Sequence, residues 1–219
     1  QQLEQLVHQY FDALPNHVCA KAPLSEPLYL AEHQALQLDI EPHKFSQRLV
    51  ASFALPDIQP WYKYKLISFL AHLLGDEGSG SLLAYLKDQG WVNQLSAGGG
   101  IDGSNYKDFT IAFELTHKGL SARDVILQAL FSTLAMLKAQ PLPQALFAER
   151  QKLLQWAYLY QEPATAQQTA NHLSVSMQHY PVSDVIFGDY RMEQPDEALY
   201  QQVLGYFTAE NMRLMLIAP

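Results

Sequence analysis

The sequence has little cysteine, little charge and no long hydrophobic run. Cys19 is the only cysteine among 219 residues, which excludes an intrachain disulfide and a cysteine-based zinc cluster. Charged residues make up only 16%, and 22 acidic against 14 basic side chains give a net charge of −8, which argues against nucleic acid as the main partner. The longest uncharged stretches contain many polar residues and hold far fewer than the roughly 20 consecutive apolar residues that span a bilayer, so we expect no membrane partner either.

Hydrophobic residues are abundant, at 48% of the chain, so the sequence predicts a folded domain rather than a disordered segment. One domain is favoured over two small lobes at this length. The chain opens without a methionine in the middle of a helical pattern, which predicts that it is a piece of a longer polypeptide. We expect residues 1–27 to form a leading helix and a proline-containing connector, followed by a domain over residues 28–219.

Hydrophobic periodicity predicts strands over 36–40, 48–55, 91–96, 109–115 and 212–217. It predicts two helices within 61–86, joined by a glycine turn at 75–80, and further helices over 121–140, 143–160, 164–179 and 195–207. We expect Gly90 to end a helix in the left-handed conformation, Ser121 to begin one with a capping box, and glycines 98–103 to turn a hairpin. This order predicts an α+β fold whose mostly antiparallel sheet is covered by helices on one face.

The sequence lacks the common motifs that would allow this chain to catalyse a reaction by itself. Neither H-E-x-x-H nor H-x-x-E-H occurs, and the eight histidines are too scattered along the chain to form a helical zinc site. No G-x-S-x-G nucleophile turn and no phosphate-binding G-x-x-x-x-G-K-[ST] loop is present. We therefore expect no catalytic residue and no metal or other cofactor in this chain.

The informative segment is His72 to Gly99, with the sequence HLLGDEGSGSLLAYLKDQGWVNQLSAGG. Its glycines permit a close approach of another chain and free main-chain N–H groups at a helix start. Spacing alone favours a tight junction between two helices, with Glu77 a solvated carboxylate and His72 an ordinary helix residue.

This segment closely resembles the second domain of the pitrilysin and insulin-degrading branch of the M16 zinc peptidases, where H-L-[IL]-G-H-E-G-x-G-S-L-L is characteristic. The resemblance extends to the arm from Leu3 to Asn16, and to residues 207–213, whose sequence FTAENMR is similar to the P-E-N-[MV]-R that opens the last strand of that domain. It implies that residues 28–219 are the second M16-type domain of a four-domain peptidase. It also implies that zinc and H-x-x-E-H lie in the preceding domain, so that this chain alone is inactive.

The resemblance further implies a role in holding peptides. In insulin-degrading relatives, part of this domain forms an exosite that holds the N-terminal end of the substrate by strand addition. Carried over to this chain, the exosite corresponds to His72, Gly75, Glu77, Leu95 and Gly98. Asp76 departs from the family pattern, since a histidine stands there in the relatives. The partners implied are peptide substrates and the other M16 domains of the same chain.

Two other interpretations stay open at this point. The parent protein could have lost its zinc motif and serve as a structural or peptide-binding subunit, as some M16 relatives do. An independent small-molecule enzyme that binds an anion at the glycine turn is disfavoured, because no catalytic base accompanies the turn. The resemblance to bacterial pitrilysins implies a periplasmic location, which a single cysteine permits.

Overall fold

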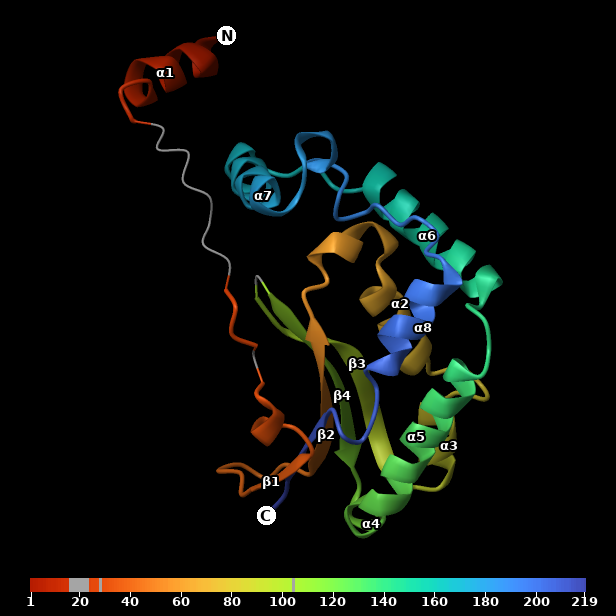
Figure 1. The fold of residues 1–219 in the computed structure, drawn as a ribbon. Helices are drawn as coiled ribbons and strands as arrows, with labels where there is room; N and C mark the ends of the chain where they lie inside the picture. The colour runs from red at the N-terminus through yellow and green to blue at the C-terminus, as the bar shows by residue number, and fades with distance from the viewer. Residues whose placement is uncertain (16–23, 28, 104) are drawn as a thin grey trace.

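A computed structural model describes residues 1–15, 24–27, 29–103 and 105–219 of the chain (Figure 1). The helices are α1 (Gln2–Phe11), α2 (Leu66–Leu74), α3 (Leu82–Asp88), α4 (His117–Ser121), α5 (Arg123–Lys138), α6 (Gln144–Leu159), α7 (Ala166–His179) and α8 (Glu197–Gly205). The strands are β1 (Leu36–Ile40), β2 (Arg48–Pro56), β3 (Val92–Asp102), β4 (Tyr106–Leu115) and β5 (Met212–Ile217). Short 3₁₀ segments η1 (Ala31–His33), η2 (Gln59–Tyr64) and η3 (Val182–Asp184) complete the described elements.

The strands form a mixed sheet in the order β1-β5-β2-β4-β3. β1 and β5 run parallel, whereas β5–β2, β2–β4 and β4–β3 are antiparallel. The last strand of the chain therefore lies between the first two, and β3 lies at the opposite edge from β1. The predicted α+β class and the mostly antiparallel sheet are confirmed.

The core lies between one face of this sheet and the helices α2, α3, α5 and α8, which cover that face in Figure 1. On β2 and β4 the apolar side chains alternate with smaller or polar ones, and Phe53 stands opposite Phe109 with both fully buried. On α5 the buried residues Ile126, Leu130 and Leu134 recur every four positions, which is the period of one helix face. Phe207, just after α8, packs its ring 5.1 Å from the rings of both Phe53 and Phe109.

The helix predicted for the leading arm is confirmed as α1, whose apolar side chains are all exposed. In Figure 1 this helix lies apart from the sheet. Most of the connector, including Cys19 and residues 16–23, lies outside the described residues. No described helix has the length and apolar character needed to cross a bilayer.

Three local predictions were wrong. The predicted hairpin is confirmed as β3 and β4, but Gly98, Gly99 and Gly100 do not turn it; they continue β3 as far as Asp102, where Gly99 and Gly100 leave room for side chains of neighbouring β4. Ser121 does not cap α5; Thr116 instead caps the short helix α4, accepting a hydrogen bond from the Gly119 N–H at 2.9 Å. Residues 61–64 are 3₁₀ rather than α-helical, and α2 starts only after Lys65. Gly90 is left-handed as predicted, with φ 70°.

Candidate functional site

The first part of the candidate site is the free edge of the sheet. β3 pairs with β4 on one side, and within the described residues no other segment makes a main-chain hydrogen bond to it. Gly98 lies on this edge strand opposite Thr110 of β4. An edge strand with an unpaired side presents N–H and C=O groups to which an extended peptide can add as a further strand.

The glycine turn lies against this edge. Gly75 ends α2, and its N–H donates to the Ala71 carbonyl at 2.9 Å. A Cβ atom built on Gly75 would lie 3.9 Å from Cβ of Ala97, the residue before Gly98, so the turn and β3 are in direct proximity. Gly80 then takes a φ of +85°, which favours glycine, and Ser81 caps α3 by accepting a hydrogen bond from the Ala84 N–H at 3.1 Å.

The predicted residues of the site differ in what they offer to a ligand. His72, in the last turn of α2, and Glu77, in the turn, are both exposed. Gly75 and Gly98 are half-buried and contribute main chain only. Leu95 is 4% exposed and its side chain packs in the core, so it too could meet a peptide only through its backbone. Glu77 is the acidic member of this predicted set and is open to solvent.

Asp76, the position that departs from the family pattern, folds back over the turn. Its carboxylate lies against Gly78, where a built Cβ atom would be 3.2 Å from the Oδ2 atom. Asp76 is exposed, as is Glu77. The turn therefore presents two neighbouring carboxylates, which favours a cationic group over an anionic one.

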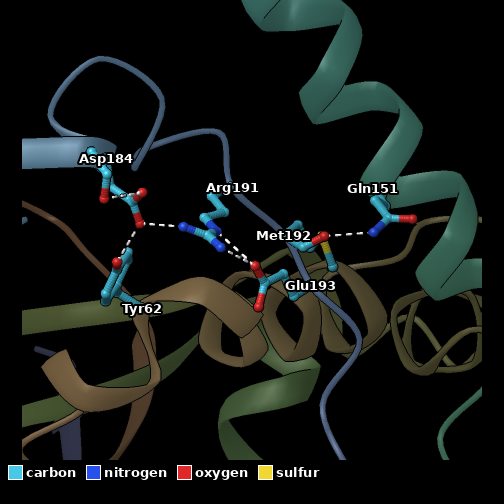
Figure 2. Close-up of polar contacts among 7 residues, drawn as sticks. Tyr62, Gln151, Asp184, Arg191, Met192 and Glu193 are labelled. Carbon is cyan, nitrogen blue, oxygen red and sulfur yellow. Dashed lines mark hydrogen bonds and ion pairs between the residues drawn. The ribbon is translucent and has the colours of Figure 1, made fainter. Parts of the chain in front are cut away.

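A second polar cluster, which the sequence did not predict, joins η2 to η3 and to the segment before α8 (Figure 2). Asp184 is buried and accepts hydrogen bonds from the Tyr62 hydroxyl and from Arg191, whose Nη1 is 2.5 Å from Oδ2. Arg191 also pairs with Glu193, whose own N–H donates to the Lys63 carbonyl at 2.7 Å. These contacts join η2 to a segment more than a hundred residues later, a distance that no local spacing pattern signals.

The ionisation of this cluster follows from its contacts. The Tyr62 hydroxyl and the Arg191 guanidinium hold the pKa of the Asp184 carboxyl below its ordinary value. Burial and the hydrogen bond to Asp184 raise the pKa of Tyr62 to about 12. At neutral pH the cluster therefore consists of a neutral phenol, a carboxylate and a guanidinium, which is a structural tie rather than an acid–base pair.

The part of the chain that the structure describes contains no group of three His, Cys, Asp or Glu side chains placed to hold a metal ion. The zinc that the family resemblance implies therefore has no fitting set of ligands in this described part. What the arrangement offers is an open strand edge, a glycine turn and exposed carboxylates.

Comparison with known proteins assigns the family. Residues 1–154 match the model of the peptidase M16 inactive domain, and residues 158–219 match that of the middle or third domain of peptidase M16. The chain belongs to the M16 peptidase family. The A-factor-processing enzyme of Saccharomyces cerevisiae is 34% identical over 199 residues, which is 89% of this chain and 19% of that protein. Human insulin-degrading enzyme is 28% identical over 99% of this chain and 21% of its own length.

Solved structures give the same fold. The crystal structure of pitrilysin superimposes with a TM-score of 0.91 at 23% identity, covering all of this chain and 23% of that one. The chain thus spans about a fifth of the relatives it matches. Within it, the residues matched by the middle-domain model supply β5, an interior strand of the sheet, and Tyr200 and Leu204 of the core. The predicted boundary between residues 27 and 28 stays a prediction.

Proposed function

We propose that this inactive M16 domain is the second domain of a pitrilysin-like zinc metalloendopeptidase. In this proposal it contributes to the wall of the peptide chamber and anchors the N-terminal end of the substrate. The observation that carries the proposal is the unpaired outer side of β3 beside the glycine turn, with Glu77 exposed next to it. A peptide added along β3 would use its main chain for binding, while a carboxylate at the turn suits the α-ammonium group of its first residue.

Glu77→Gln in the full-length parent tests the anchoring role. Because Glu77 is exposed, its pair with an ammonium group contributes about 0.2–1 kcal/mol, so we expect KM for short peptides with a free N-terminus to rise by a factor of about 1.4 to 5. N-acetylated versions of the same peptides should be nearly unaffected. Glu149→Gln, at an exposed position of α6, is the matched control. An equal rise for free and acetylated peptides would refute anchoring.

The catalytic part of the proposal is tested by the coding sequence before Gln1. We expect a similar domain that carries H-x-x-E-H and a distal glutamate, with zinc bound by the full-length protein. A preceding domain in which these ligands are replaced would instead make the parent a non-catalytic subunit. Stoichiometric zinc and chelator-sensitive hydrolysis by this chain alone would overturn the assignment of a non-catalytic role.

We also propose a periplasmic location for the parent protein. One structural neighbour, with a TM-score of 0.70 at 12% identity, is the periplasmic protease PqqL of Escherichia coli. Cell fractionation with an antibody against this chain tests the location, and recovery in the cytosolic fraction would contradict it.

A further inference from the structure

A pocket of about 430 Å³ lies between η2, the start of α2 and the end of the sheet. Its wall is largely apolar and includes Ile58, Trp61 and Val203. The charged side chains that line it in the described part of the chain are two lysines, Lys65 and Lys107.

Lys65 is held in an uncommon conformation. Its φ of 49° and ψ of 30° are left-handed, a region that non-glycine residues rarely occupy and that often marks a functional position. Among the described residues its ammonium group has no hydrogen bond or ion pair, and burial lowers its pKa. The negative charge of Asp189 acts in the opposite direction and raises the pKa of Lys65. The Asp189 carboxylate, however, already accepts a hydrogen bond from the Tyr180 hydroxyl at 2.7 Å and pairs with His172 at 3.4 Å.

The second lysine reaches the pocket because Gly99 has no side chain. A Cβ atom at Gly99 would lie 2.5 Å from Cε of Lys107, in the space that this side chain occupies. Lys107 pairs with Asp102 at 2.7 Å, and 14% of its side chain is exposed. Gly99 directly follows Gly98 on β3, so the pocket adjoins the proposed path of a bound peptide.

The cluster in Figure 2 fixes the segment that carries Lys65. Tyr62 is bound to Asp184, and the Lys63 carbonyl accepts from the N–H of Glu193. The ring of Tyr62 also packs 4.9 Å from that of Tyr180, which in turn lies 5.8 Å from the Lys65 ammonium group. The main chain that carries the lysine is thus held in place before any ligand binds, which reduces the entropy lost on binding.

We propose that this pocket binds a carboxylate group of the peptide substrate, with the adjoining apolar side chain packed against Trp61 and Ile58. A carboxylate would give the Lys65 ammonium group the charged partner that it lacks, whereas a cationic group would face two lysines. The apolar wall favours an organic acid over a small inorganic anion. Since the ligand is taken to be a peptide, this inference rests on the proposed function, although its first test does not.

The first test uses the full-length protein with two small probes, 3-phenylpropionate and its neutral amide, and measures binding by calorimetry. We expect the acid to bind about tenfold more tightly than the amide. Lys65→Gln should remove most of this preference, Lys65→Arg should keep it, and Lys87→Gln, at an exposed position of α3 outside the pocket, should change nothing. Equal binding of acid and amide, or no effect of Lys65→Gln, would overturn the proposal.

Gly99→Ala provides a second variant that keeps Lys65. The added methyl group meets the far end of a flexible side chain, so the fold should tolerate it while Lys107 leaves the pocket. We expect a weaker affinity for the acid and an unchanged affinity for the amide. An unchanged affinity for the acid would exclude Lys107 and contradict the two-lysine site.

The second test distinguishes the two sources of a peptide carboxylate. With catalysis blocked by a chelator, a peptide that contains one glutamate is compared with its C-terminally amidated form and with its Glu→Gln form. Loss of Lys65-dependent affinity on amidation assigns the pocket to the C-terminal carboxylate, and loss on Glu→Gln assigns it to the side chain. If neither change reduces the Lys65-dependent affinity, the pocket does not bind a peptide carboxylate and the peptide assignment is overturned. N-acetylation tests the anchor at Glu77 separately, so failure of one site is distinguishable from failure of the other.

Discussion

Alanine at Gly119 tests how the start of the edge strand is held in place. Gly119 is buried in α4, and a Cβ atom there would lie 1.9 Å from the carbonyl oxygen of Trp91, the residue before β3. That carbonyl accepts hydrogen bonds from the Thr116 N–H at 2.9 Å and from its hydroxyl at 3.2 Å. A normal contact needs more than 3 Å, so α4 or the start of β3 must move by about 1 Å or more, which disturbs these bonds.

The expected cost follows from these contacts. Overpacking of this kind costs about 1–3 kcal/mol, and a weakened hydrogen bond adds about 1 kcal/mol. We therefore expect Gly119→Ala to lower the free energy of unfolding by about 2–4 kcal/mol. At roughly 2–4 °C per kcal/mol for a chain of this size, Tm should fall by about 4–16 °C.

Thermal unfolding followed by circular dichroism measures this effect. Gly205→Ala, at the end of α8, is the matched control, because a Cβ atom there meets nothing within 4 Å. The control should leave stability unchanged or raise it by up to about 1 kcal/mol. If the Gly119→Ala variant is as stable as the wild type, α4 does not pack on the start of β3 as described. In the full-length parent we also expect the variant to weaken peptide binding at β3, because the strand start shifts.

Two further predictions concern the surroundings of the site. The lowered pKa of Asp184 means that its ionised form stabilises the fold at neutral pH, and that this contribution is lost as the pH falls below the ordinary value near 3.8. Asp184→Asn should therefore be less stable than wild type at pH 7 and lose less stability on acidification; parallel pH profiles of the unfolding free energy would contradict this. Ser81→Ala removes the N-cap of α3 and should cost about 0.5–2 kcal/mol in urea unfolding, whereas Ser81→Asp should retain most of the stability; equal losses in both variants would refute capping.

The sequence predicted the secondary structure where neighbouring residues decide it. The apolar positions of α5 and the alternation of Phe109, Ile111 and Phe113 follow from the periods of a helix and a strand, which act over a few residues. The left-handed Gly90 is a local signal of the same kind. The glycine segment from His72 to Gly99 carried the resemblance to the M16 family, which the family models then confirmed over most of the chain.

The sequence failed where a distant partner decides the local structure. Gly98 to Gly100 are typical of a turn, yet pairing with β4 keeps them in a strand whose glycines make room for Lys107 and Asp108. Leu95 matched the exosite pattern, but only packing revealed that its side chain lies in the core. In the same way, the insertion of β5 between β1 and β2 and the contact of Tyr62 with Asp184 join residues more than a hundred positions apart.

By itself, then, the sequence determined the family, the class of fold and the turn that carries Glu77, because these depend on local spacing and on a contiguous motif. Only the tertiary structure decided that β3 is a free edge and that Lys65 lines an apolar pocket. Both of these depend on which segments pack together, and such long-range contacts produce no periodic pattern in the sequence from which they could be predicted.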